Sequence, residues 1–137
     1  MAIKKINIVS EFVLFGIVSD KNNYTIVSQI NSELNYAFSQ KENIKIIDKT
    51  IKKEFPVFEY IDECNNRKFR FINNYYKGGY LVYQLKEINF LIQIYDNINY
   101  EFKQEFIKKI KSLKNIILIS EIDKKYYKKI KHLHYMQ

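Results

Sequence analysis

The chain has 137 residues, 47% of them hydrophobic, which suits one domain with a single core and excludes a disordered chain. Its formal net charge of +8 would suit a nucleic-acid-binding protein, but only two of its 23 basic residues are arginine, the side chain that forks onto phosphates and base edges. Because Ile, Lys, Asn, Tyr and Phe have A/T-rich codons and dominate the chain, we attribute most of the charge to the codon bias of an A/T-rich genome.

The first elements predicted are a strand and a helix. Residues 12–18 are almost wholly apolar, which predicts a central strand of a sheet. In the helix that follows, Ser19 and Asp20 are alternative N-caps, and Asn35 suits the left-handed residue that ends it. Its apolar positions recur at helical spacing: Tyr24, Val27, Ile30 and Leu34.

The middle of the chain is typical of short strands. Residues 36–40 alternate apolar and polar side chains, and Pro56 precedes a second alternating run at residues 57–62. After a polar turn, residues 69–73 are predicted to be the return strand. Residues 41–54 carry isoleucines at a helical spacing that lysines interrupt, so we predict a loop there, with one helical turn as an alternative.

Two glycines, Gly78 and Gly79, precede the apolar run of residues 80–85. This run and residues 88–95 predict two further strands with a short turn between them. The glycine pair is loosely similar to the strand signature of an RNA-recognition motif, but an aromatic position that would stack on a base is missing. We therefore interpret the pair as a turn in which glycine supplies a positive φ.

The last third of the chain predicts a second helix and a final strand. Asn97 and Asn99 are alternative caps for the helix, and its early glutamates and late lysines suit the helix dipole. Residues 115–122 predict the strand, after which Asp123 is expected to cap a short terminal helix. The apolar face of the second helix consists of Phe102, Phe106, Ile110 and Leu113. The apolar face of the short terminal helix consists of Tyr126, Ile130 and Leu133.

These elements predict a single domain over residues 1–137, of the α+β class. We expect an antiparallel-rich single sheet with two main helices packed on one face, plus a short C-terminal helix or tail. Short turns join most of the neighbouring strands, which is the reason to expect antiparallel pairing.

The stretch after the glycine pair aligns with a short signature motif. The matching positions are Val82, Tyr83, Gln84, Ile88, Asn89 and Phe90. On these residues the chain resembles the bacterial IPExxxVDY family, and the resemblance extends over most of the chain. It implies a shared fold but little about function, because the family has no established activity.

Two departures from this signature concern its chemistry. Gln84 stands where the family has Glu, and Asn89 stands where it has Asp. An amide keeps the shape of the acid but cannot exchange a proton. If the two acids are catalytic or bind a metal in the family, this chain lacks that chemistry here. If they are structural hydrogen-bond partners in a turn, amides can replace them.

Other reactive side chains are few and unfavourably placed. Cys64 is the only cysteine, and its acidic neighbours oppose activation of a thiol nucleophile. His132 and His134 lack the further ligands that a zinc site needs. We interpret the carboxylates near Cys64 as a solvated rim: Glu59, Asp62 and Glu63. We therefore predict no catalytic residue, no metal site and no cofactor.

The most basic segment of the chain lies near its C-terminus and interleaves lysines with tyrosines. It is the best candidate for a contact with a polyanion, although such a stretch is also typical of a solvated helix face. The residues predicted for this contact are Lys124, Lys125, Tyr126, Lys128, Lys129 and Lys131.

The sequence therefore favours a non-enzymatic binding or interaction module. Twelve Tyr and ten Phe exceed what one small core easily hides, and tyrosine is enriched at contacts, so we expect a protein partner or self-association. The alternative is a weak RNA- or ribosome-associated protein that acts through the basic C-terminal segment. We expect no small-molecule ligand and no membrane association. A lone cysteine and the absence of a signal-peptide pattern suit a cytoplasmic location.

Overall fold

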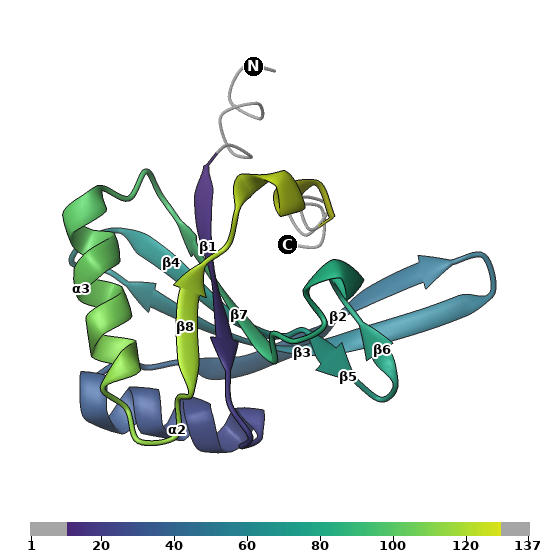
Figure 1. The fold of residues 1–137 in the computed structure, drawn as a ribbon, viewed down its shortest axis with the longest axis horizontal. Coiled ribbons are helices and arrows are strands. Elements are labelled where there is room, and N and C mark those ends of the chain that lie inside the picture. The colour runs from purple at the N-terminus through teal and green to yellow at the C-terminus, as the bar shows by residue number, and fades with distance from the viewer. Residues whose placement is uncertain (1–10, 130–137) are drawn as a thin grey trace.

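The computed structural model describes residues 11–129, apart from the side chains of Asp48, Lys128 and Lys129, and Figure 1 shows its fold. The strands of its main sheet are β1 (Phe12–Val18), β2 (Ser39–Asp48), β3 (Ile51–Asp62), β4 (Arg67–Asn73), β7 (Phe90–Tyr95) and β8 (Leu118–Glu121). They lie in the order β2-β3-β4-β7-β1-β8, and every neighbouring pair is antiparallel. With two helices beside this sheet, the predicted α+β class is confirmed.

Strand β1 is central, as its apolar run predicts, because it pairs with β7 on one side and β8 on the other. Its alternate side chains enter two different hydrophobic clusters. Phe15 and Ile17 belong to the larger cluster, on what we name the first face of the sheet. Leu14 belongs to the smaller cluster, on the second face. Both faces are covered at this strand, which explains why the run does not alternate with polar residues.

Helix α2 (Asn23–Leu34) begins later than predicted. Its N-cap is Asn22, whose Oδ1 accepts a hydrogen bond from the Thr25 backbone N–H at 2.9 Å, so the predicted caps Ser19 and Asp20 are wrong. Ser19 instead donates its hydroxyl to the Asn115 carbonyl at 2.7 Å. Asn35 ends the helix with φ of 62°, as predicted.

The buried face of α2 differs from the predicted one by part of a turn. Ile26, Val27 and Ile30 are buried, whereas Tyr24 is 58% exposed. Tyr24 lies in the first turn of the helix, where its hydroxyl reaches outward to donate to Gln40 Oε1 at 2.9 Å. A tyrosine at the helix start thus keeps its polar end hydrated while its ring contacts Phe58 edge-on.

Helix α3 (Tyr100–Lys111) agrees with its prediction. Of the two alternative caps, Asn99 is the one used, since its Oδ1 accepts from the Phe102 backbone N–H at 2.8 Å. Phe106 and Ile110 are fully or nearly buried, as is Leu113 just after the helix. These residues share the larger hydrophobic cluster with residues of α2 and with the first face of the sheet.

Residues 41–54 form two strands, so the predicted loop is wrong. They are the outer part of the β2–β3 hairpin, which extends well beyond the other strands in Figure 1. Lys49, with φ of 58°, lies in its turn. The helical spacing of the isoleucines is overridden by the pairing of β2 with β3, in which β-branched isoleucines are favoured. The predicted strand at residues 36–40 is correspondingly wrong at its start, since β2 begins at Ser39.

The apolar run at residues 80–85 is not a strand of the main sheet, which corrects a second prediction. The chain leaves β4 into a small hairpin, β5 (Tyr75–Tyr76) and β6 (Gly79–Tyr80), and then forms a 3-10 helix, η1 (Tyr83–Leu85). The predicted glycine turn is confirmed, with φ of 84° at Gly78. Leu81 and Val82 are buried in the smaller cluster, so this run covers the second face of the sheet.

The last strand, β8, is shorter than the predicted span of residues 115–122. It is followed by a second 3-10 helix, η2 (Lys124–Lys129), where a short terminal helix is predicted. The Asp123 carboxylate accepts a hydrogen bond from the Lys125 backbone N–H at 2.9 Å. Tyr126 and Tyr127 pack against the smaller cluster. The other two residues of the predicted apolar face, Ile130 and Leu133, lie outside the described residues.

Candidate functional site

The residues of the signature-like stretch do not converge on one site. Val82 is buried on the second face of the sheet, and Phe90 is buried on the first. Ile88 packs at the edge of the smaller cluster. Tyr83 is 61% exposed, and Gln84 is exposed as well. The stretch therefore spans the thickness of the sheet and does not line one closed cavity.

Asn89 has a structural role in this position. Its Oδ1 accepts a hydrogen bond from the Ser19 backbone N–H at 2.8 Å, and its own backbone N–H donates to the Ile17 carbonyl at 2.9 Å. Both contacts tie the start of β7 to the end of β1. A carboxylate oxygen could accept the first bond equally well. This geometry fits the alternative in which the acids of the signature are hydrogen-bond partners in a turn.

Asn74 holds residues 80–88, which we name the cover segment, in place over the second face of the sheet, and this role was not predicted from the sequence. It is fully buried, and its Nδ2 donates to the carbonyls of Leu85 at 2.9 Å and Ile88 at 3.0 Å. A longer bond of 3.4 Å reaches the carbonyl of Val82, whose N–H donates to Asn74 Oδ1 at 2.8 Å. The available signal was an asparagine directly after a strand that alternates apolar and polar residues, but asparagine is common there.

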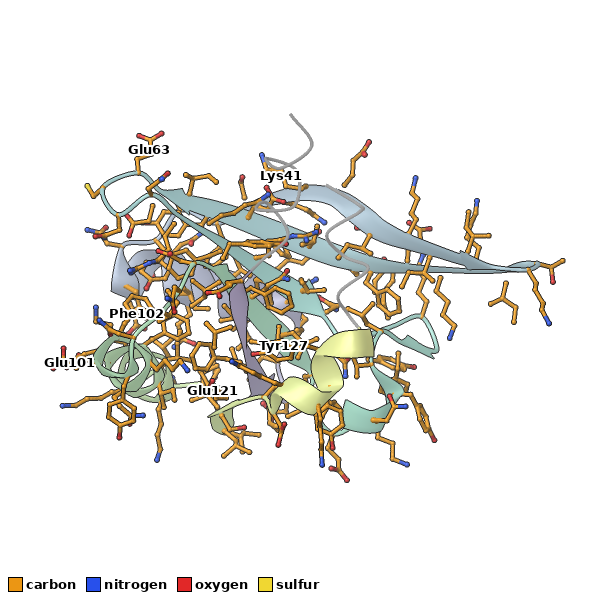
Figure 2. All side chains as sticks on the ribbon, turned by 90° about the horizontal axis from the view of Figure 1, so that it is seen from above. Lys41, Glu63, Glu101, Phe102, Glu121 and Tyr127 are labelled. Atoms are coloured by element: carbon orange, nitrogen blue, oxygen red, sulfur yellow. The ribbon has the colours of Figure 1, made fainter. Side chains whose placement is uncertain are left out.

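The outer part of the β2–β3 hairpin carries apolar and cationic side chains in direct cross-strand register. We name residues 44–54 the arm. Ile46 pairs with Lys53, and Ile47 pairs with Lys52. Ile47 is 67% exposed, and Ile51 beside the turn is 58% exposed. Figure 2 shows the end of the arm standing clear of the rest of the protein, with side chains on both of its sides.

A group of tyrosines lies beside the arm. In the β5–β6 hairpin, the ring centroids of Tyr75 and Tyr80 are 5.0 Å apart, and those of Tyr80 and Tyr83 are 5.7 Å apart. Tyr75 is 47% exposed. An open hollow of about 110 Å³ between hairpin and arm is lined by residues of both, Lys53 and Gly79 among them. We name residues 44–54 and 75–83 together the arm surface.

Most of the other aromatic side chains are used in packing. Tyr36 stacks on Tyr60 with ring centroids 4.9 Å apart and lies 5.3 Å from the ring of Phe69. Burial raises the pKa of the Tyr36 hydroxyl from 10.0 to about 12, and the neighbouring Tyr60 adds to the rise. A phenol that keeps its proton so firmly serves as a packing group and is a poor general base at neutral pH.

The basic C-terminal segment is only partly within the described structure. Lys124 and Lys125 are exposed on η2, and the Lys125 ammonium lies 5.2 Å from the centre of the Tyr126 ring. The backbone of Lys128 and Lys129 continues η2, whereas Lys131 lies outside the described residues. Tyr126 and Tyr127 pack inward, so the segment is not a freely solvated tail as far as Tyr127.

The remaining candidate chemistry is dispersed. Cys64 is exposed in the β3–β4 turn, where Figure 2 shows Glu63 pointing outward. Asp62 accepts a hydrogen bond from Asn65 Nδ2 at 2.9 Å. Glu59 instead forms ion pairs on the second face of the sheet, described below. Within residues 11–129 no three His, Cys, Asp or Glu side chains gather as a metal site would require. His132 and His134 lie outside that range.

Comparison of the chain with family models and with curated protein sequences found no match. The resemblance to the IPExxxVDY family therefore stays a prediction. No helix among the described residues has the length and apolar character needed to cross a membrane.

Proposed function

We propose that this protein is a non-enzymatic binding module whose contact site is the arm surface. The observation that carries the proposal is the pair of large aliphatic side chains, Ile47 and Ile51, exposed near the end of a projecting two-stranded arm. Ile44 and Ile46 at the base of the arm pack in the smaller cluster, whereas exposing Ile47 and Ile51 near its end gives folding no benefit. They are explained if a partner covers them. The adjacent exposed tyrosines add the side chain most favoured at such contacts.

The charge of the arm surface favours a distinct, acidic protein partner over a second copy of this chain. The arm holds four lysines and two carboxylates, and the hairpin adds Lys77. A symmetric contact between two copies would bring these like charges together, which is unfavourable. A partner with carboxylates around an apolar groove would pair with the lysines and cover the isoleucines.

The proposal is tested by capturing partners with the full chain and with a variant that changes only the arm. The double change Ile47→Thr and Ile51→Thr keeps two β-branched side chains but removes apolar contact area. Because both sites are exposed, stability should change by less than about 1 kcal/mol. We expect a partner retained by the original chain to be lost with this variant, and to bind the purified chain directly.

Ile117→Thr is the matched control, since Ile117 is 65% exposed at a site outside the arm surface. This variant should retain the partner. Equal capture of the partner by the arm variant and by the original chain would contradict the proposal. It would also be contradicted if the original chain is strictly monomeric and captures no partner protein.

The second candidate function is weak RNA association through the basic C-terminal segment. It is supported by the exposure of Lys124 and Lys125 while Tyr126 packs inward, so that the lysines face solvent together. Changing Lys124, Lys125, Lys128 and Lys129 to Glu should abolish RNA binding, and unchanged binding would refute this function. Retention on RNA that disappears by about 0.3 M salt without sequence preference would indicate electrostatic attraction alone.

The arrangement of the helices is part of this proposal. We take α2 and α3 to cover the first face of the sheet, which leaves the second face to the segments at residues 75–89 and 124–129. The support is that Ile30 of α2 and Phe106 of α3 share one cluster with Phe15 of β1. In this arrangement, the part of the arm surface at residues 75–83 lies on the second face of the sheet, opposite the helices.

A further inference from the structure

A row of polar side chains crosses the second face of the sheet beside the smaller hydrophobic cluster. Glu59 of β3 is directly opposite Arg70 of β4, and Arg70 is directly opposite Gln93 of β7. Arg70 is 3% exposed and Gln93 is fully buried. Burying a guanidinium and an amide in a sheet is costly unless their hydrogen-bonding groups are satisfied.

Only part of this row is satisfied by protein groups. Arg70 Nη1 donates to the Tyr95 hydroxyl at 3.1 Å, and that hydroxyl donates to Gln93 Oε1 at 3.1 Å. Arg70 Nε lies 3.6 Å from Glu59 Oε2, beyond a good hydrogen bond. Among the described residues, neither Arg70 Nε nor Gln93 Nε2 has a hydrogen-bond acceptor. Two buried N–H donors, on residues that are directly opposite each other in β4 and β7, therefore have no hydrogen-bond acceptor among the described residues.

Arg70 lines an open hollow of about 500 Å³ at the β2 side of this row. The other charged residues around the hollow are three lysines and two glutamates: Lys41, Lys45, Lys68, Glu42 and Glu59. With Arg70 the cations outnumber the carboxylates by two. Figure 2 shows Lys41 on the β2 edge of the sheet. The wall of the hollow thus contains Arg70, whose buried Nε is unmatched, together with a surplus of positive charge.

We propose that this hollow binds a small oxyanion of the phosphate-monoester class, with Arg70 Nε as its buried donor. A guanidinium suits phosphate oxygens because its N–H groups are held in a planar fork. The surplus of two positive charges matches a dianionic phosphate better than the single charge of a carboxylate. Lys41 and Lys45 supply charge at the open side of the site.

Glu59 explains why the site is selective for a strongly charged ligand. Its carboxylate lies 3.6 Å from both Arg70 Nε and Lys68 Nζ. An incoming anion must compete with it for Arg70. Replacing this carboxylate with an amide should therefore strengthen anion binding, whereas a purely structural ion pair would give no binding to strengthen.

The chain contains only two arginines, which makes a direct test simple. The probe is inorganic phosphate, titrated into the isotope-labelled full chain at constant ionic strength while the Nε–Hε signals are followed by NMR. The Arg70 signal should shift and saturate. The Arg67 signal should not, because Arg67 Nε is 3.3 Å from Asp96 Oδ2 at a different site. The variant Arg67→Lys assigns the two signals.

Three variants separate this site from general attraction to a basic protein. Lys41→Gln with Lys45→Gln should weaken phosphate binding about tenfold. The pair Lys108→Gln and Lys109→Gln, which removes the same charge from α3, should leave binding unchanged. Glu59→Gln should tighten it.

A shift of the Arg70 signal that does not saturate would overturn the proposal, as would equal effects of the two lysine pairs. Acetate that binds as tightly as phosphate would also overturn it, because the site would then be a carboxylate site. The arm variant Ile47→Thr with Ile51→Thr should titrate like the original chain. Lys45 belongs to both surfaces, but Ile47 and Ile51 do not line the hollow, so the phosphate site and the proposed arm surface can succeed or fail separately.

Discussion

Replacing Asn74 with Ala should be among the most damaging single changes in this protein. The side chain is fully buried between β4 and the cover segment, and it bonds to backbone groups of three residues there. Alanine removes the donor and the acceptor at once without filling the space. The cover over the second face of the sheet should then separate from it more easily.

The size of the effect follows from which groups lose a partner. The carbonyls of Val82 and Leu85 still accept from the backbone N–H groups of Leu85 and Ile88, at 3.0 and 2.8 Å. The Val82 N–H and the Ile88 carbonyl depend on Asn74. Leaving a buried polar group unmatched costs about 1–3 kcal/mol, so the two groups together should lower the free energy of unfolding by about 4 kcal/mol.

Equilibrium urea denaturation measures this loss, and Asn73→Ala is the matched control. Asn73 is the same residue type one position earlier and is also buried. Its side chain accepts from Asn23 Nδ2 at 3.0 Å and donates to the Tyr75 carbonyl at 3.3 Å. This change should cost about 1–2 kcal/mol, because only one group of a buried residue, Asn23 Nδ2, loses its partner, whereas Tyr75 is 47% exposed.

Amide hydrogen exchange gives a second, local measurement. In the Asn74→Ala variant the Val82 amide should exchange much faster than in the original chain. The exchange rates of β1 amides should change only as much as the loss of global stability requires. If Asn74→Ala costs no more than Asn73→Ala, or if the Val82 amide keeps its protection, the reasoning that Asn74 holds the cover is wrong.

Three further changes test other contacts. Gly16→Ala should lower the free energy of unfolding by about 1–3 kcal/mol in urea denaturation, because the added Cβ would lie 2.9 Å from Ile122 Cδ1 and 3.0 Å from Ile88 Cγ2; no loss would contradict this steric reasoning. Tyr127→Phe removes the hydroxyl that accepts from the Leu14 N–H at 3.0 Å, so that amide should exchange faster, and unchanged exchange would contradict the contact. The pKa of Tyr36 is raised from 10.0 to about 12 on folding, so the unfolded chain loses its proton first and stability should fall as pH rises through this range. Tyr36→Phe should make that fall shallower, as measured by urea denaturation at each pH.

Several local features of the fold were predicted from short-range chemistry, although the N-cap of α2 was not, since it is Asn22 and not Ser19 or Asp20. Asn99, one of the two alternative caps, caps α3, and Asn35 ends α2 in a left-handed conformation as predicted. Gly78 supplies a positive φ in a turn. In each case the deciding interaction lies within four residues along the chain, so the sequence contains it.

The sites were less predictable, because each depends on residues far apart in the chain. The unmatched Arg70 donor results from register across three strands, and neither it nor Gln93 has an unusual sequence context. Ile47 and Ile51 suggest a helix by spacing and become exposed only because β2 and β3 pair beyond the rest of the sheet.

By itself the amino-acid sequence determined the α+β class, the central apolar strand β1 and the amphipathic face of α3. Only the tertiary structure decided whether the apolar run at residues 80–85 joins the sheet or covers it. An apolar segment can be buried either way, because hydrophobic burial has no direction. What distinguishes the two outcomes is the set of hydrogen bonds that Asn74 makes to residues eight to fourteen positions later.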